Sequence, residues 1–346
     1  MWFYSLIFFL VAGIQAAGYF FKYPKLSFWS CIVLLILVAA FRPVSSNKDQ
    51  NTYIEYYRDI KDIPLSFLEP TYFVFAEISR VIFNSPIGIF ILYSILGVSL
   101  KGLALTRLTK YYSVSLILYC GSFFLLHEMT QIRVGVASAI LLLGIPSIAN
   151  KNKKEFIFYW ILGSLFHYSF MIFGLFYFLD GDKINPKFYV GMILASIGAA
   201  ILGLNLVWFF QFVNLGFISE KINTYKALLD EGMYADIQLL NPLLILRIII
   251  LGVMLYKAKL LRERNQYALV LIKIYAFSIF FFIALSDLPT LAGRLNQLFG
   301  VVEIVVVPFL IYILTPKYCA VIFSILFGML ILYKQLYYSD LIFDYF

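Results

Sequence analysis

Residues 132–149 read IRVGVASAILLLGIPSIA, an apolar run whose one charged side chain, Arg133, lies near its start. A helix needs roughly 20 such residues to cross a hydrocarbon core of about 30 Å. Similar runs recur along the whole chain of 346 residues, which is 62% hydrophobic and 13% charged. Lipid offers no partner for backbone groups, and the runs lack the alternation of barrel strands, so the sequence predicts membrane-spanning helices.

These runs predict an all-α, polytopic integral membrane bundle that forms a single transmembrane domain over residues 1–346, with about 11–12 spans. The expected spans are 1–21, 26–41, 86–106, 112–127, 132–149, 156–180, 188–206, 242–258, 267–286, 298–314 and 318–337. A weaker segment, 70–83, carries Glu77 and Arg80 on one helical face and is expected at the membrane surface. No large soluble domain is expected.

The basic residues indicate on which side of the membrane each loop lies. They gather in short turns, namely Lys22–Lys25, Lys101–Lys110, Lys151–Lys154, Lys257–Arg264 and Lys317. Cytoplasmic loops collect lysine and arginine, so we expect these turns in the cytoplasm and loops 42–70 and 207–241 on the outer side of the membrane. The net charge of +8 therefore reflects topology and anionic membrane lipid, and we expect no nucleic-acid partner.

An odd number of apolar runs separates two turns that should share one side of the membrane. Between Lys151–Lys154 and Lys257–Arg264 the chain has three runs: 156–180, 188–206 and 242–258. We expect 156–180 to be a broken or re-entrant hairpin, because His167 and its polar neighbours interrupt its middle. An extra partial crossing within 188–218 is the alternative.

Four arginines are expected at or just inside the outer face: Arg42, Arg133, Arg247 and Arg294. Arg294 is expected in an outer turn, 287–298. Arginine binds diphosphate oxygens with bidentate geometry and stays charged when partly buried, so together these side chains predict a cationic pocket. Each arginine could instead reach lipid headgroups or pair with a carboxylate. Glu303, inside a span, needs such a partner, and Arg294 is the candidate.

Further polar candidates lie in loop 42–70 and at the interrupted run. Asp49, Tyr53 and Tyr57 recur every four residues and would share a helical face. Asp49 could orient or deprotonate a sugar hydroxyl beside the tyrosine rings, or it could cap a helix beneath an interfacial tyrosine belt. His167 could act as a base or stabilise a helix break.

Scattered cysteines and histidines and the absence of a phosphate-binding Gly-Lys loop lead us to expect neither a metal nor a cofactor.

The order of several short motifs carries a family resemblance. The motifs are Phe41-Arg42, Asp49-x-x-x-Tyr53, Gln131-Ile132-Arg133-Val134-Gly135-Val136-Ala137, Phe166-His167-Tyr168-Ser169 and Gly293-Arg294-Leu295. In this order the chain resembles the O-antigen polymerases called Wzy and the exopolysaccharide polymerases of the EpsG type. It departs from them in having Ser45-Ser46-Asn47-Lys48 where relatives often have glycines before the aspartate.

The resemblance implies a glycosyltransferase of GT-C-like architecture in the bacterial inner membrane, with its active site facing the periplasm. Such an enzyme moves a growing glycan from undecaprenyl diphosphate to the non-reducing end of an incoming lipid-linked repeat. Its expected partners are those lipid-linked oligosaccharides and membrane lipids, and the sequence leaves a polysaccharide chain-length regulator open. The catalytic candidates are Asp49, Arg133, His167 and Arg294. The substrate-binding candidates are Arg42, Tyr53, Tyr57, Arg247 and Glu303.

Two other functions use related substrates. A flippase for lipid-linked oligosaccharides would need charged residues along a path to both faces, often within repeated halves. Here the candidate residues are expected on the outer side, and the sequence has no internal repeat. An O-antigen ligase would be expected to carry a larger periplasmic domain than these loops provide.

Overall fold

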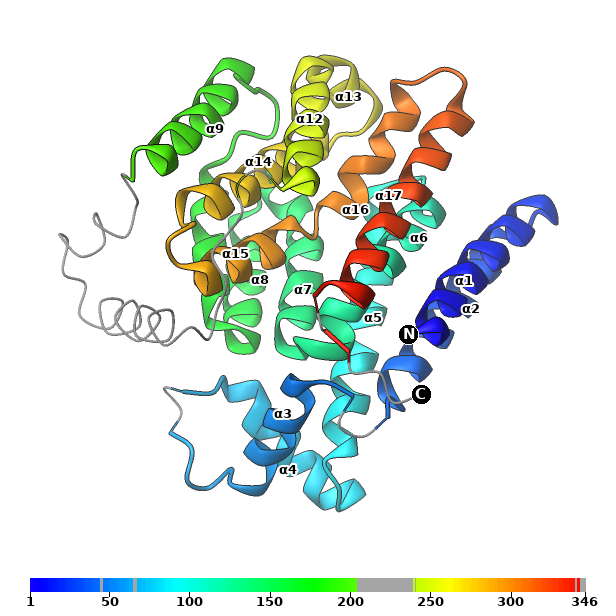
Figure 1. Ribbon diagram of the computed structural model, residues 1–346, viewed down its shortest axis with the longest axis vertical. Helices are drawn as coiled ribbons and strands as arrows, with labels where there is room; N and C mark the ends of the chain where they lie inside the picture. The colour runs from blue at the N-terminus through cyan, green and yellow to red at the C-terminus, as the bar shows by residue number, and fades with distance from the viewer. Residues whose placement is uncertain (44–45, 65–66, 204–238, 240, 340, 343–346) are drawn as a thin grey trace. The chain divides into compact units, whose positions relative to one another are not determined.

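The computed structural model describes residues 1–43, 46–64, 67–203, 239, 241–339 and 341–342. All regular elements within these ranges are helices, which confirms the predicted all-α class. The chain forms two compact units. The first contains Met1–Tyr177 and Val307–Phe346, and the second contains Phe178–Val306. Figure 1 labels the helices of both units along the chain.

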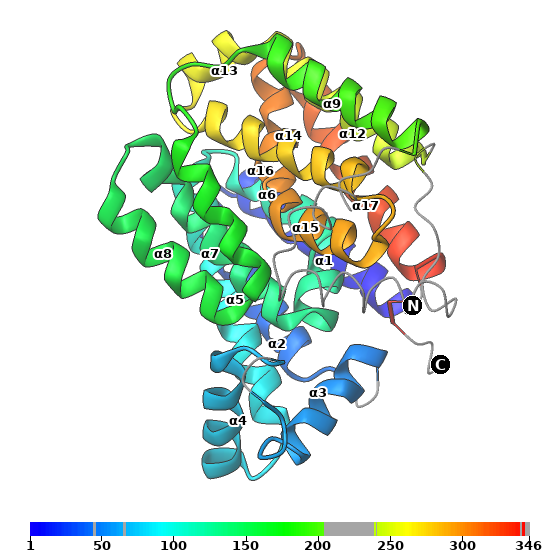
Figure 2. The same ribbon diagram turned by 90° about the vertical axis from the view of Figure 1, so that its left-hand side faces the viewer.

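The first unit holds most of the helices. They are α1 (Trp2–Phe20), α2 (Pro24–Ala40), α3 (Lys48–Arg58), α4 (Pro70–Phe83), α5 (Ile87–Leu108), α6 (Tyr112–Ser122), η1 (Phe124–Thr130), α7 (Ile132–Ala149), α8 (Lys153–Phe166), η2 (Tyr168–Phe178), η3 (Val307–Tyr312) and α17 (Lys317–Tyr337). Helix α7 is its centre and packs against α5 and α8, as Figure 2 shows. Gly135 also allows α7 to approach η1 closely, because a Cβ there would lie 2.7 Å from a backbone carbonyl oxygen of η1.

The second unit consists, in its described part, of shorter helices. They are α9 (Pro186–Ile201), α12 (Pro242–Tyr256), α13 (Ala258–Arg264), α14 (Ala268–Ala284), α15 (Pro289–Gly300) and α16 (Glu303–Val306). Helix α14 packs against α9, α12 and α15 and is the central element of the unit. The expected loop 207–241 lies almost entirely outside the described residues.

Several described helices are long and apolar enough to cross a membrane, which confirms the polytopic prediction. Four qualify by themselves, namely α1, α5, α7 and α17. The number rises to six if two bent pairs, Tyr112–Ser122 with Phe124–Thr130 and Pro289–Gly300 with Glu303–Tyr312, are each one span. Five shorter apolar helices, α2, η2, α9, α12 and α14, coincide with most of the remaining expected spans.

The predicted interruption at His167 is present and reverses the chain. Helix α8 ends before His167, whose backbone is extended, and the 3₁₀ helix η2 follows. Trp160 Nε1 of α8 donates to Met171 O of η2 at 2.9 Å, and Lys151 Nζ donates to Tyr177 O at 3.0 Å. These contacts pair the start of one helix with the end of the other. The segment 156–180 is therefore an antiparallel hairpin, which removes the odd crossing from the expected count.

Other local predictions had mixed outcomes. The helix expected over 70–83 is confirmed as α4. The outer turn expected over 287–298 is wrong, because Pro289 begins the helix α15 there. Lys101 is not part of a basic turn: it lies within α5 and is fully buried. Apolar periodicity alone could not reveal that Lys101 has a buried partner far along the chain.

Candidate functional site

The loop after α2 is fixed by two side chains that donate to one carbonyl oxygen. Asn47 caps α3 by accepting from Gln50 N at 2.8 Å, and its Nδ2 donates to Met129 O at 2.8 Å. Arg42 Nη1 donates to the same oxygen at 2.7 Å. The cap is thus Asn47, so Asp49 lies in the first turn of α3, on the expected helical face. Asn47 therefore anchors the start of α3 to η1.

Arg42 is buried and well supplied with hydrogen-bond acceptors. Its Nε donates to Ala39 O at 2.8 Å, and Nη2 lies 3.4 Å from Ser94 Oγ. The guanidinium carbon lies 4.7 Å from the centre of the Phe90 ring. Burial lowers the pKa of Arg42 to about 10, so the group stays charged at neutral pH. With its Met129 contact, all three nitrogens are engaged within the protein.

A cluster of charged side chains forms around Glu69, directly before the first residue of α4. The Glu69 carboxylate pairs with Arg133 Nη1 and accepts from His167 Nδ1 at 2.9 Å and from Tyr168 N at 3.3 Å. Loop 42–70, the start of α7 and the α8–η2 turn thereby meet at one carboxylate. Burial would raise the pKa of Glu69, but the His167 hydrogen bond and the Arg133 charge outweigh burial and lower the pKa to about 2.

Arg133 also contacts an aromatic wall. Its guanidinium carbon lies 5.6 Å from the centre of the buried Tyr53 ring, which stacks on Tyr72. Burial raises the pKa of Tyr53, the Arg133 charge opposes this, and the Asp49 charge adds to it. Among the described residues, Arg133 Nε has no hydrogen-bond acceptor although it is buried. Arg133 therefore keeps a donor beyond those that Glu69 uses.

The structure brings together three of the predicted site residues and leaves Tyr57 aside. Arg133, His167 and Tyr53 meet around Glu69, and Asp49 lies close enough to Tyr53 for its charge to act on the phenol. Tyr57 lies farther along α3, where its ring and its carbonyl oxygen contact Arg80 of α4.

Glu69 was not among the site residues predicted from the sequence. The available signal was an acidic residue before the proline that begins α4, but this pattern does not reveal the distant partners of the carboxylate.

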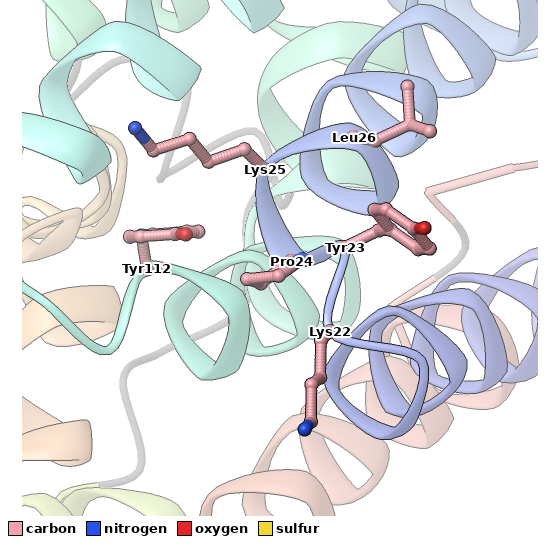
Figure 3. A pocket seen from close by; sticks show the side chains of 6 residues that line it. All are labelled: Lys22, Tyr23, Pro24, Lys25, Leu26 and Tyr112. Atoms are coloured by element: carbon pink, nitrogen blue, oxygen red, sulfur yellow. The ribbon is translucent and has the colours of Figure 1, made fainter.

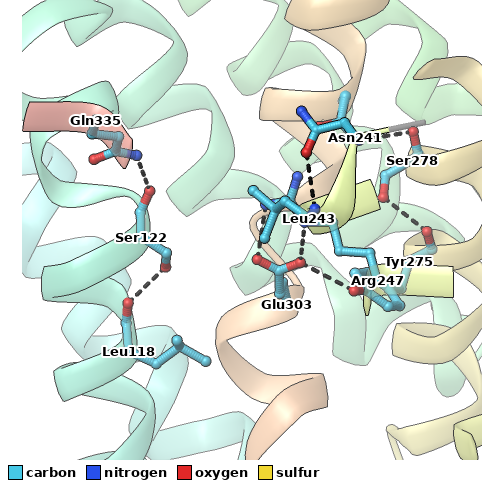
Figure 4. Close-up of polar contacts among 10 residues, drawn as sticks. Leu118, Ser122, Asn241, Leu243, Arg247, Tyr275, Ser278, Glu303 and Gln335 are labelled. Atoms are coloured by element: carbon cyan, nitrogen blue, oxygen red, sulfur yellow. Dashed lines mark hydrogen bonds and ion pairs between the residues drawn. The ribbon is translucent and has the colours of Figure 1, made fainter. Parts of the chain in front are cut away.

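The second unit holds a different arginine–carboxylate pair. Arg247 Nε and Nη2 donate to the two oxygens of Glu303 at 2.7 and 3.0 Å, and Tyr275 Oη lies 3.1 Å from Glu303 Oε2 (Figure 4). The predicted pairing of Glu303 with Arg294 is therefore wrong. Arg294 is an exposed residue of α15. Arg247 comes from α12, and the spacing along the chain gave no means of choosing between the two arginines.

An open hollow of about 450 Å³ lies at the turn between α1 and α2, shown in Figure 3. Its lining consists of Lys22, Tyr23, Pro24, Lys25, Leu26 and Tyr112. None of the predicted site residues lines it, and it contains no carboxylate or imidazole that could act as a base. The Glu69 cluster is therefore the better candidate for a chemical site.

The fold and this cluster define an all-helical membrane protein in which an arginine, a carboxylate and a histidine meet. The EpsG family profile matches residues 25–345, so the chain belongs to the EpsG family, as the order of its motifs predicted. The chain is also similar to the amylovoran biosynthesis protein AmsC of Erwinia amylovora. The two are 21% identical over 283 residues, which cover 78% of this chain and 74% of that protein. No solved structure matches the chain.

Proposed function

We propose that the protein is a polysaccharide polymerase. It would transfer a growing glycan from undecaprenyl diphosphate to the non-reducing end of an incoming undecaprenyl-diphosphate-linked repeat. Membership of the EpsG family and the likeness to an amylovoran biosynthesis protein support this class of reaction. The observation that carries the proposal is the Glu69 carboxylate, which Arg133 and His167 share. One cluster thus offers a cation for a diphosphate and an imidazole for a hydroxyl.

Arg133 would stabilise the leaving diphosphate. When the glycosidic C–O bond to the diphosphate breaks, the electron pair stays on the diphosphate oxygen and negative charge grows there. A preorganised guanidinium lowers the barrier to such a step most strongly where water is scarce. Arg133 is four-fifths buried, and its Nε has no acceptor among the described residues. Glu69 would hold the guanidinium in place without using all of its donors.

His167 would accept the proton of the attacking acceptor hydroxyl. Because the pKa of Glu69 is lowered to about 2, its carboxylate is ionised at neutral pH and can only accept a hydrogen bond. The proton between the two side chains would therefore lie on His167 Nδ1, and Nε2 would be the basic atom whenever the ring is neutral. The acceptor oxygen would bond to the anomeric carbon as its proton moves to Nε2, a proton transfer that such bases typically assist.

The remaining candidates take supporting roles in this proposal. Asp49 and Tyr53 would contact the acceptor sugar, and Arg42 would hold their loop. Tyr57 would lie at the outer end of the same helical face. A role for Arg294, an exposed residue of α15, in binding the diphosphate stays a prediction from the sequence. We propose that Arg247 and Glu303 satisfy one another and support the fold around α14, because their bidentate pair uses both carboxylate oxygens.

The proposal places the Glu69 cluster at the periplasmic face of the bacterial inner membrane. Support comes from the charge distribution, since Lys151 lies at one end of the α8–η2 hairpin and His167 at the other. A hairpin with both ends at the basic side agrees with the cytoplasmic turns expected from the sequence. A polysaccharide chain-length regulator as partner stays a prediction from the resemblance.

The test is chain extension by Arg133→Ala in bacteria that lack their own copy of the protein. The expected result is loss of the polysaccharide ladder while the variant stays in the membrane at the level of the unchanged protein. Arg262→Ala is the matched control, because Arg262 forms an exposed pair with Asp182 in a turn expected on the opposite side. A normal ladder from Arg133→Ala would contradict the proposed role.

The same cells distinguish the two other functions. Loss of a polymerase leaves lipid A-core capped with a single repeat, whereas loss of a flippase leaves no repeat at all. Loss of a ligase leaves long glycans on undecaprenyl diphosphate. Only the first outcome agrees with the proposed function.

A further inference from the structure

A second charged cluster lies wholly inside the first unit. Lys101 Nζ lies 2.6 Å from Glu128 Oε1, and the two side chains are 0% and 1% exposed. Lys101 Nζ also donates to Gly135 O at 2.6 Å, and Tyr119 Oη donates to Glu128 Oε1 at 2.9 Å. Burial of an ion pair rarely adds net stability over apolar side chains of similar size. The reason for this pair should therefore be sought in what it holds in place.

Two glycines keep the space that the Glu128 carboxylate occupies. A Cβ at Gly97 of α5 would lie 2.2 Å from Glu128 Oε2, and a Cβ at Gly135 of α7 would lie 3.2 Å from the same oxygen. Even alanine at Gly97 would force the carboxylate to move. The ion pair thus depends on close contact of α5, η1 and α7.

Glu128 belongs to η1, a seven-residue π-helix. Such segments are rare and often occur at functional sites. The next carbonyl, Met129 O, is the one that receives both Arg42 and Asn47. Asn47 caps α3, which carries Tyr53 to the ring contact with Arg133. A chain of direct contacts therefore runs from the buried ion pair through η1 to α3.

We propose that Lys101 and Glu128 are positioning residues that pin η1, so that its Met129 carbonyl holds loop 42–70 and α3 beside Arg133. Neither residue would touch substrate. The importance of this arrangement for polymerisation rests on the proposed function, but the arrangement itself can be tested without the reaction. A buried pair that only stabilises the fold would not act on α3 in particular.

Hydrogen exchange of the full-length protein in lipid nanodiscs measures the arrangement directly. Gly97→Ala should displace the carboxylate, and Lys101→Met/Glu128→Gln should remove the pair without leaving an unpaired charge. In both variants the amides of α3 should exchange about tenfold faster, while the amides of α17 and the melting temperature stay unchanged. Gly13→Ala is the matched control, because a Cβ there meets no atom within 4 Å.

A double-mutant cycle separates this path from independent effects. Asn47→Ala removes the α3 end of the path and should itself speed exchange in α3. If both changes act through Met129 O, adding Gly97→Ala to Asn47→Ala should have a smaller effect than Gly97→Ala has alone. Because Asn47 is far from the ion pair along the chain, this variant also serves if the buried variants fail to fold.

Two results would overturn the proposal. One is unchanged α3 exchange in Gly97→Ala and in the double variant. The other is an equal gain in exchange over all helices, which would make the pair a general stabiliser. Chain extension by the same variants is a separate measurement. If the unaltered protein never extends a glycan, the proposed function is contradicted. Faster exchange of the α3 amides in the variants would then still support the positioning role.

Discussion

Two arginine–carboxylate pairs of this protein differ in how completely each charge is satisfied. In the second unit, Arg247 and Glu303 form a bidentate pair with both carboxylate oxygens engaged. In the first unit, Glu69 divides its oxygens between Arg133 and His167, and Arg133 Nε has no acceptor among the described residues. In the proposed function the closed pair supports the fold, whereas the shared carboxylate positions a cation and an imidazole for chemistry.

The largest expected effect is the loss of the proposed base. His167→Ala should lower the rate of chain extension about 10²–10⁴-fold, the usual contribution of a positioned base. The rate should be measured with purified protein and a synthetic lipid-linked repeat. Tyr168→Phe, a change at the adjacent residue, is the control and should keep most of the rate. Equal losses in both variants would indicate a local structural effect and break the contrast between the two pairs.

The closed pair should show its effect in stability. Glu303→Leu leaves Arg247 buried without its carboxylate and should lower the free energy of unfolding by about 3–5 kcal/mol. Arg247→Leu/Glu303→Leu should regain most of this loss, because no unpaired charge remains. Denaturant unfolding in detergent micelles measures both variants. If the double variant regains stability but fails to extend glycans, the Arg247–Glu303 pair has a chemical role. The contrast between this pair and the Glu69 cluster would then be wrong.

Acid should weaken the Glu69 cluster within a defined range of pH. The pKa of Glu69 is about 2 in the folded protein against an ordinary value of 4.5. A lowered pKa adds stability above the ordinary value, and this stability is lost as pH falls from about 4.5 towards 2. The shift corresponds to roughly 3 kcal/mol. Unfolding measured across this range should depend less on pH in Glu69→Gln, and equal pH dependence in both proteins would contradict the low pKa.

The smallest effect is expected at the aromatic wall. Tyr53→Phe keeps the ring beside Arg133 and should change the extension rate less than tenfold, whereas Tyr53→Leu removes a cation–π contact that is typically worth about 0.5–2 kcal/mol. Both rates can be compared in the same purified assay. A larger loss in Tyr53→Phe than in Tyr53→Leu would show that the phenol oxygen matters more than the ring.

Local patterns were sufficient to predict most of the helices. The apolar runs gave the α class, and the amphipathic segment over 70–83 is α4 to the residue. The hairpin at His167 followed from charge parity and a polar interruption, both of which are visible along the chain. These features depend on neighbouring residues and on the need to satisfy backbone groups in lipid.

The pairing of charges could not be predicted in the same way. Glu69 meets Arg133 and His167 across 64 and 98 residues, and Arg247 meets Glu303 across 56. Such pairs depend on which helices pack together, and periodicity along one helix carries no information on that. The arginines could be selected from the sequence because a charged side chain in lipid is energetically costly. Their carboxylate partners could be identified only from the packing of the helices.

The most direct test of the central claim is the initial rate of chain extension by Glu69→Gln, purified in lipid nanodiscs with a synthetic undecaprenyl-diphosphate-linked repeat. Glutamine keeps the shape of the side chain but removes the charge that orients His167 and Arg133. The rate should fall at least about 100-fold while the protein remains folded. A rate within a few-fold of the unaltered protein would contradict the assignment of this cluster as the polymerase site.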